Sequence, residues 1–292
     1  ALQLAALSDL ARVDPWACWE CYQPPLYYWV ASSTVWLTAG IVEFSGPWKA
    51  AQALSVVASC GTLLLAAFAL VILLPEREHR WAVWFCLTVL AILPRAIYSS
   101  AMATNDALLE LGVVMALVGY LLITTRLNAS RAGLWLVAVG TLVACWTKQS
   151  GLLLTIPVAI TTIAVLTGRW QPPKGISTRT LVSALALVLF LAGLDEAWRY
   201  ARTGILLVSN QEYFAHASTQ LPGVLSGVSF HDLRGYSLMD DVFMGPSSLG
   251  SFWTELFARF WFDYERRFFP VNPLAIALGR FAYAYGAMVT VG

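Results

Sequence analysis

The chain has 292 residues, of which 59% are hydrophobic and only 12% are charged. Soluble domains contain roughly 45–50% apolar and about 25% charged residues. The composition therefore excludes a disordered chain, a secreted disulfide scaffold and an ordinary cytosolic enzyme. A net charge of +1 gives no support for a nucleic-acid partner. With a mean hydropathy of +0.67, the sequence predicts an all-α, polytopic helical membrane protein embedded in a lipid bilayer.

The two ends of the sequence resemble internal positions of a longer protein. The chain opens on Ala1 without an initiator Met or signal peptide, and it closes at Gly292 inside an apolar stretch. We therefore expect truncation at both ends. Residues 1–11 predict a short surface helix, since Leu recurs along one side of this segment.

The apolar stretches that follow predict a membrane-spanning bundle. The stretches long enough to cross a bilayer are 49–74, 81–97, 106–125, 132–147, 152–168, 180–197 and 273–292. These stretches divide the chain into three regions. Residues 1–197 form a transmembrane module with two N-terminal surface helices, 198–272 form a polar loop region, and 273–292 form a further, incomplete transmembrane helix.

The basic residues of the short loops predict the orientation of this bundle. Loops 75–80, 126–131 and 169–179 contain seven Lys and Arg residues, whereas the alternate loops 98–105 and 148–151 contain only Lys148. Cytoplasmic loops are enriched in Lys and Arg. We therefore expect the first set on the cytoplasmic side, and the N-terminal 25 residues and 198–272 on the extracytoplasmic side, at a plasma, inner or endoplasmic reticulum membrane.

Residues 26–42 form an eighth apolar stretch that this orientation does not allow to cross. Both the N-terminal segment and the start of 49–74 are expected outside, so 26–42 should lie along the outer interface as a helix. Its aromatic residues Tyr27, Tyr28, Trp29 and Trp36 suit the headgroup zone.

Cysteine and histidine give weaker signals. Cys18 and Cys21 form a CxxC pair, which is compatible with a disulfide on an oxidising face or with two packed thiols. A four-ligand zinc site is not expected there, because no second ligand pair accompanies it. His216 and His231 leave a metal site in a folded-back loop open, so we assign no metal ligand but keep a divalent metal open as a cofactor.

Polar residues gather at the predicted outer ends of the helices. They are Glu20, Gln23, Arg95, Asn105, Asp106, Glu110, Lys148, Asp195, Glu196 and Arg199. Ionisable groups at membrane depth are costly, so this concentration at one face favours an outward-facing functional cavity.

Several of these residues also have a structural alternative. The carboxylate of Asp106 suits the positive N-terminal end of its helix dipole. Asn105, directly before it, is a residue type that caps helices. Lys148 and Arg95 suit snorkelling or pairing at the interface, and Glu110 suits a hydrogen bond within the bundle. Asp195 and Glu196, by contrast, are expected to mark a solvated helix end.

Several short elements resemble the polytopic GT-C glycosyltransferases, such as lipid A aminoarabinose transferases and protein O-mannosyltransferases. The first element is Gln23-Pro24-Pro25-Leu26 between two surface helices. The second is Ser100 followed by Asp106 and Leu108 at a helix start, and the third is the run from Thr147 to Gly151. Residues 251–253 and 261–263 are similar to a Trp-rich element of that superfamily. The order of these elements covers nearly the whole chain.

The resemblance implies inverting sugar transfer from a polyprenyl- or dolichyl-phosphate donor to a hydroxyl of a protein, lipid or glycan acceptor. Asp106 and Glu20 are the implied catalytic carboxylates. Gln23, Arg95, Asn105 and Lys148 are the implied substrate-binding residues, with Arg95 and Lys148 near the departing phosphate.

One departure from the family pattern concerns the general base. The principal carboxylate of the family precedes the first surface helix, where this chain begins. Asp9 and Asp14 are the only nearby substitutes and their spacing fits poorly.

Two other classes of function remain open on the sequence. A non-catalytic relative that serves as a structural subunit of a membrane assembly would need no such carboxylate. A lipid or solute transporter would be expected to show inverted repeats and polar residues at mid-depth, and neither is visible.

Overall fold

The structure is a computed structural model that describes residues 14–16, 21–38, 47–125, 130–172 and 175–208. The chain divides into two compact units. The first contains Ala1–Thr88 and Ser99–Ala217. The second contains Val89–Tyr98 and Ser218–Gly292, of which residues 89–98 are described. The predicted surface helix 1–11, most of the loop region 198–272 and the stretch 273–292 lie outside the described residues.

The described part of the chain is helical throughout its regular structure, which confirms the all-α prediction. In chain order the helices are α2 (Leu26–Thr38), α3 (Pro47–Leu73), η2 (Arg77–His79), α4 (Arg80–Ile92), α5 (Pro94–Ala101), α6 (Asp106–Thr124), α7 (Ser130–Thr147), η3 (Gln149–Leu154), α8 (Thr155–Leu166) and α9 (Thr178–Thr203).

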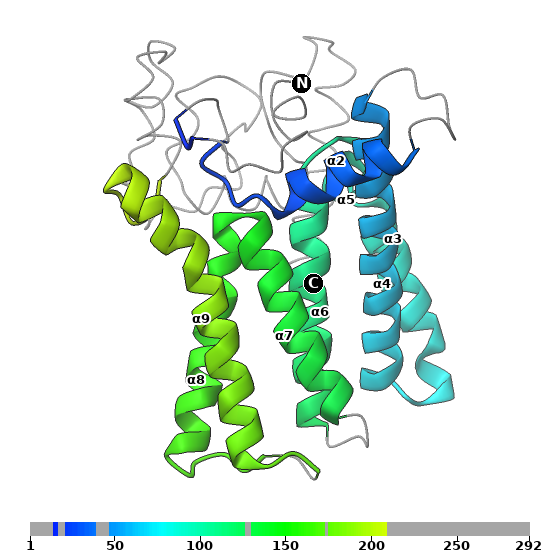
Figure 1. The fold of residues 1–292 in the computed structure, drawn as a ribbon. Coiled ribbons are helices and arrows are strands. Elements are labelled where there is room, and N and C mark those ends of the chain that lie inside the picture. The colour runs from blue at the N-terminus through cyan, green and yellow to red at the C-terminus, as the bar shows by residue number, and fades with distance from the viewer. Residues whose placement is uncertain (1–13, 17–20, 39–46, 126–129, 173–174, 209–292) are drawn as a thin grey trace, which may run out of the picture. The chain divides into compact units, whose positions relative to one another are not determined.

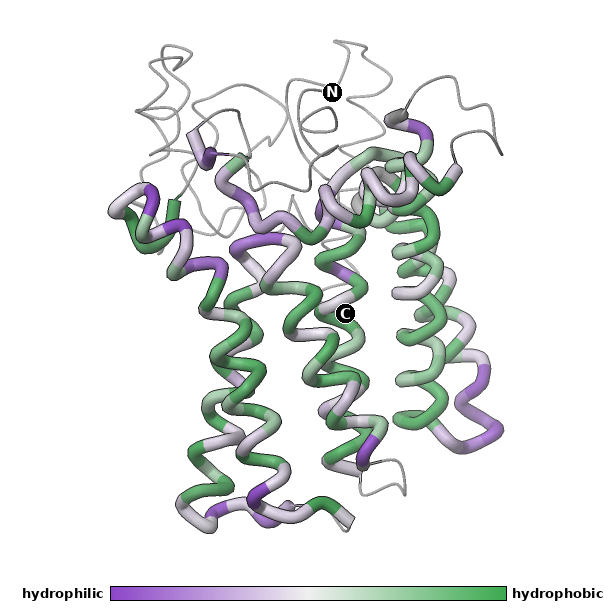
Figure 2. The backbone as a smooth tube through the Cα atoms, in the orientation of Figure 1, coloured by the Kyte–Doolittle hydropathy of each residue, from purple (hydrophilic) through white to green (hydrophobic). Residues whose placement is uncertain are grey.

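Four segments of the described chain are long and apolar enough to cross a membrane: Trp48–Leu73, Asp106–Thr124, Gln149–Leu166 and Thr178–Thr203. Figure 2 shows their apolar middle stretches between more polar ends. The chain is therefore a helical membrane protein. The third segment combines the 3-10 turn η3 with α8, and α7 is a shorter apolar helix.

Two predicted spans differ from the observed helices. The stretch 81–97 is not one helix, because α4 ends at Ile92 and α5 begins at Pro94. Proline disfavours helical backbone in the residue before it, and its ring fits the first position of a new helix. The span predicted to end at residue 197 continues to Thr203, where Gly204 with a φ of 70° closes α9.

The helix ends that flank the three basic connections lie together in the first unit. The ends of α3, α6 and α8 and the starts of α7 and α9 all lie at one end of these helices (Figure 1). The start of α6 and the end of α7 lie at the opposite end. This arrangement agrees with the alternation of loops in the sequence, and the sidedness of the membrane stays a prediction.

Helix α2 confirms the helix expected within residues 26–42, and it lies crosswise to α3, α6 and α7 (Figure 1). The aromatic residues that suit the headgroup zone differ in their exposure. Tyr27 is buried in a cluster with Ala31, Ala51 and Leu108, whereas Trp36 is 77% exposed. The apolar contacts of Tyr27 fix α2 to the ends of α3 and α6.

Small residues allow α6 and α7 to approach closely. A Cβ atom added to Gly119 would lie 2.6 Å from the carbonyl oxygen of Gly133, and one added to Gly140 would lie 2.5 Å from the backbone nitrogen of Ala116. Such backbone contact between helices is typical of membrane proteins, where association depends on close packing. This contact sets the distance between the two helices that hold the polar site described below.

Candidate functional site

An ion pair joins the first residue of α6 to the residue that follows α7. The Lys148 Nζ atom lies 2.5 Å from Asp106 Oδ1, and the two residues are 42 positions apart in the chain. The Lys148 side chain is 27% exposed and that of Asp106 is 19% exposed. The partial burial keeps the pair accessible to a ligand while it strengthens their attraction relative to bulk water.

The local backbone explains why Lys148 occupies this place. Lys148 has an extended conformation between α7 and η3, and its carbonyl oxygen accepts a hydrogen bond from the Gly151 nitrogen at 2.9 Å. A Cβ atom on Gly151 would lie 2.2 Å from the carbonyl oxygen of Ala144. Only glycine fits this turn, so the final Gly of the Thr-Lys-Gln-Ser-Gly run holds the turn tightly on the end of α7.

The loop before α2 meets the same turn. The Gln149 nitrogen donates a hydrogen bond to Gln23 Oε1 at 3.3 Å, across 126 positions of sequence. Gln23, Asp106 and Lys148 come from the three N-terminal elements of the resemblance. The structure brings these three predicted residues together at one end of the helices.

Several donors of this region have no hydrogen-bond partner among the described residues. They are Asn105 Nδ2, Gln149 Nε2, Thr147 Oγ1 and Trp29 Nε1. Asn105 is only 4% exposed and occupies the N-cap position of α6, but its side chain makes no capping hydrogen bond. The Asp106 nitrogen is instead 3.3 Å from Thr104 Oγ1, which accepts its hydrogen bond. Buried donors without partners are costly, so these atoms suit a ligand rich in acceptor oxygens.

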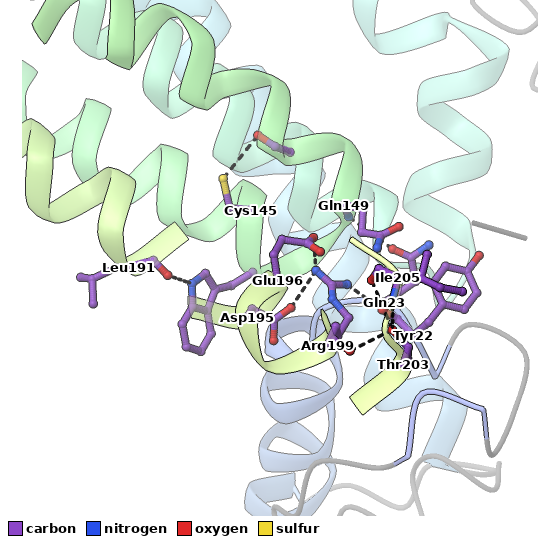
Figure 3. A network of polar contacts seen from close by, with 12 residues as sticks. Tyr22, Gln23, Cys145, Gln149, Leu191, Asp195, Glu196, Arg199, Thr203 and Ile205 are labelled. Carbon is purple, nitrogen blue, oxygen red and sulfur yellow. Dashed lines mark hydrogen bonds and ion pairs between the residues drawn. The ribbon is translucent and has the colours of Figure 1, made fainter. Parts of the chain in front are cut away.

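The expectation of a solvated helix end at Asp195 and Glu196 is wrong. Both residues are buried, and Arg199 between them and the end of α9 is only 2% exposed. Arg199 Nη2 lies 3.0 Å from Asp195 Oδ2 and also pairs with Glu196 Oε1, as Figure 3 shows. The carboxylates lie three and four residues before the arginine, which is the spacing of neighbours on one helix face. That spacing was a visible signal for an ion network.

The same arginine reaches the loop before α2. Arg199 Nη1 donates a hydrogen bond to the carbonyl oxygen of Tyr22 at 2.6 Å (Figure 3). Sequence reasoning missed this contact, because nothing in the pattern indicates which backbone carbonyl a buried guanidinium will reach.

The other residues predicted for the site either contact different groups or lie outside the described residues. Arg95 lies in α5, and its part in binding stays a prediction. Glu110 Oε1 accepts a hydrogen bond from Ser99 Oγ at 3.4 Å, which agrees with its structural alternative. Asp14 Oδ1 accepts a hydrogen bond from the Trp16 nitrogen at 2.9 Å. Glu20, Asp9, Cys18, His216, His231 and the segments 251–253 and 261–263 lie outside the described residues.

The described residues also bear on the cysteine pair and on a metal site. Cys21 is disulfide-bonded, which matches one of the two alternatives for the CxxC pair. In the part of the chain that the structure describes, no three His, Cys, Asp or Glu side chains gather to hold a metal ion. Among the described residues, the site contains the Asp106–Lys148 ion pair and a set of buried amide, indole and hydroxyl donors, with the Arg199 ion network nearby.

This site can hold an anionic or hydroxyl-rich group, because it combines a partly exposed carboxylate and ammonium group with several buried N–H donors that lack partners among the described residues. Comparison of the whole chain with protein-family models, with curated proteins and with solved structures finds no match.

Proposed function

We propose that this chain is part of a membrane glycosyltransferase that moves a sugar from a polyprenyl-phosphate donor to an acceptor hydroxyl. The observation that carries the proposal is the Asp106–Lys148 ion pair, together with the Gln23–Gln149 hydrogen bond beside it. Three elements of the GT-C resemblance, far apart in sequence, meet in these two contacts. A chance likeness of short motifs would not require them to converge.

The chemistry of the site supports a phosphate-linked sugar as substrate. An ammonium group has three N–H donors, and among the described residues Lys148 Nζ has Asp106 as its one hydrogen-bonded partner. Lys148 therefore keeps donors for a phosphate oxygen. The donors of Asn105, Gln149 and Trp29 that lack partners suit sugar hydroxyls or further phosphate oxygens.

The proposed reaction is an inverting displacement. The acceptor oxygen attacks the anomeric carbon, the bond from that carbon to the lipid-phosphate oxygen breaks, and its electron pair leaves with the phosphate. A carboxylate acts as general base and takes the proton of the acceptor hydroxyl; Glu20 is the candidate that the resemblance implies beside Asp106. Lys148 stabilises the negative charge that grows on the departing phosphate, and Asp106 holds Lys148 and orients the acceptor. Glu20 stays a second catalytic carboxylate and Arg95 a second phosphate-binding cation only on the resemblance, and we propose the reaction on the extracytoplasmic face.

The test is a transfer and donor-hydrolysis assay on the full-length protein in lipid nanodiscs. The donors are polyprenyl- and dolichyl-phosphates that carry different hexoses and pentoses. We expect turnover of one donor class, and a fall of about 100-fold or more in Asp106→Asn, as for loss of a group that orients reactants. The Lys148→Met variant should bind the donor more weakly.

The matched control is Glu110→Gln, which makes the same chemical change one turn further along α6. Glu110 contacts Ser99, so this variant should keep its turnover. A folded full-length protein that turns over no donor would refute the enzyme and favour the structural-subunit alternative. Full activity in Asp106→Asn would remove Asp106 from the mechanism.

A further inference from the structure

Arg199 ties the end of α9 to the loop before α2. Its guanidinium uses Nη2 for the carboxylates of Asp195 and Glu196, and Nη1 for the backbone carbonyl of Tyr22. A guanidinium is planar and presents its donors in a fixed fork. The two carboxylates therefore fix the orientation of the guanidinium plane. The guanidinium in turn fixes the position of the Tyr22 carbonyl.

Apolar packing holds the same loop from a second side. Tyr22 is 3% exposed and packs with Val208, which is fully buried, while Trp16 and Ile205 pack against this cluster. The residues just after α9 thus cover Tyr22, and Arg199 at the end of α9 binds its backbone. Both contacts act on the residue that directly precedes Gln23.

The contacts continue from this loop to the ion pair. Gln23 Oε1 accepts the hydrogen bond of the Gln149 nitrogen, and Gln149 follows Lys148, which pairs with Asp106. A displacement of Tyr22 would move Gln23 away from Gln149 and remove the hydrogen bond that positions the turn carrying Lys148, while the hydrogen bond within that turn remains.

We propose that Arg199 is a positioning residue that holds Tyr22 and Gln23 in place and thereby sets Lys148 against Asp106 for sugar transfer. This inference rests on the function proposed above. A buried ion network contributes little net stability compared with apolar packing of similar volume. Its specific contribution here is to orientation, because the guanidinium joins the two carboxylates of α9 to the backbone carbonyl of Tyr22 in a distant loop.

The test must separate positioning from folding. Arg199→Met alone would leave two buried carboxylates without their cation, which is strongly destabilising. The informative variant is therefore the triple change Arg199→Met, Asp195→Asn and Glu196→Gln, which removes all three charges together. The matched control is Arg202→Met, since Arg202 lies on the same helix, is exposed and stacks over Trp198 at 5.7 Å.

The first readout is hydrogen exchange at the Gln149 amide of the full-length protein in nanodiscs. In the triple variant this amide should exchange about tenfold faster, because its acceptor Gln23 is no longer held. The Gly151 amide, bonded to the Lys148 carbonyl within the same turn, should keep its rate. Arg202→Met should leave both rates unchanged. An unchanged exchange rate of the Gln149 amide in the folded triple variant would show that Arg199 does not hold Gln23 in place.

The second readout is turnover, with kcat and the KM for the lipid donor measured separately. Misplacement of Lys148 should lower kcat about 10- to 100-fold, as a shift of about 1 Å does in enzymes, while the donor KM changes little. A merely structural role predicts a loss only in proportion to the loss of folded protein. Unchanged kcat in the folded triple variant would overturn the positioning role.

The two readouts distinguish failure of this inference from failure of the proposed function. An active wild type with an equally active triple variant refutes the role of Arg199 and leaves the transferase standing. A wild type that turns over no donor refutes the transferase, and with it any part of Arg199 in the reaction. The exchange rate of Gln149 then still decides whether Arg199 holds the loop.

Discussion

Replacement of Gly140 by alanine should destabilise the contact between α6 and α7 that carries the site. A Cβ atom at residue 140 would lie 2.5 Å from the backbone nitrogen of Ala116 and 2.6 Å from the carbonyl oxygen of Gly112. Both are backbone atoms of α6, so no side-chain rotation relieves the clash. Optimal contact between heavy atoms is roughly 3.5–4.0 Å, so the helices must separate locally by about 1 Å.

The magnitude follows from two opposing effects. Overpacking of a close-packed interior costs about 1–3 kcal/mol, whereas alanine gains about 0.5–1 kcal/mol over glycine inside a helix. Subtraction of the two ranges leaves a net loss in the free energy of unfolding of about 0–2.5 kcal/mol, with a middle value of about 1 kcal/mol. Because α7 ends at Thr147 beside Lys148, the same separation should also weaken the ion pair with Asp106.

The control is Gly193→Ala on α9, where an added Cβ meets no atom within 4 Å. This variant should be neutral or stabilised by up to about 1 kcal/mol. The assay is equilibrium unfolding of both variants in mixed micelles of dodecyl maltoside and SDS, followed by tryptophan fluorescence. Equal stability of the two variants would refute the reasoning, since it would mean that α6 and α7 do not touch at Gly140.

The remaining predictions concern the ion pair and the orientation. Lys148→Met and Asp106→Asn should each lower stability by about 1–2 kcal/mol, because each leaves a half-buried partner behind, and the double variant should lose less than their sum. Thermal unfolding of the three variants measures this, and additive losses would show that the two side chains do not interact. A single cysteine placed at Ser150 should react with a membrane-impermeant maleimide added to intact cells, whereas one placed at Arg77 should not. Both positions are exposed, but Ser150 follows the end of α7 and Arg77 follows the end of α3, and these two helix ends lie at opposite ends of the bundle (Figure 1). The reverse labelling would overturn the orientation.

Much of the helical architecture is readable from the sequence, because an apolar stretch must satisfy its backbone hydrogen bonds internally once it enters a bilayer. The positions of α3, α6, α7, α8 and α9 follow closely from this rule. The break at Pro94 shows its limit, since hydropathy alone does not register the backbone effect of proline.

The candidate site was readable only in part. The sequence singles out Gln23, Asp106 and Lys148, and the structure brings them together. The sequence misjudged Asp195 and Glu196, because two carboxylates near a helix end look the same in a sequence whether water or a neighbouring loop covers them. The structure shows that Tyr22 and the residues after α9 cover this end.

The sequence by itself determined that this protein is a helical membrane protein and which polar residues gather at the ends of its helices. These properties depend on composition and on spacing along one helix, which are local quantities. Only the tertiary structure decided that Lys148 pairs with Asp106, that Gln149 bonds to Gln23, and that Arg199 reaches Tyr22. Each of those contacts joins residues tens of positions apart or more. Their geometry depends on how closely the helices pack, which here depends on backbone contact at Gly119, Gly140 and Gly151.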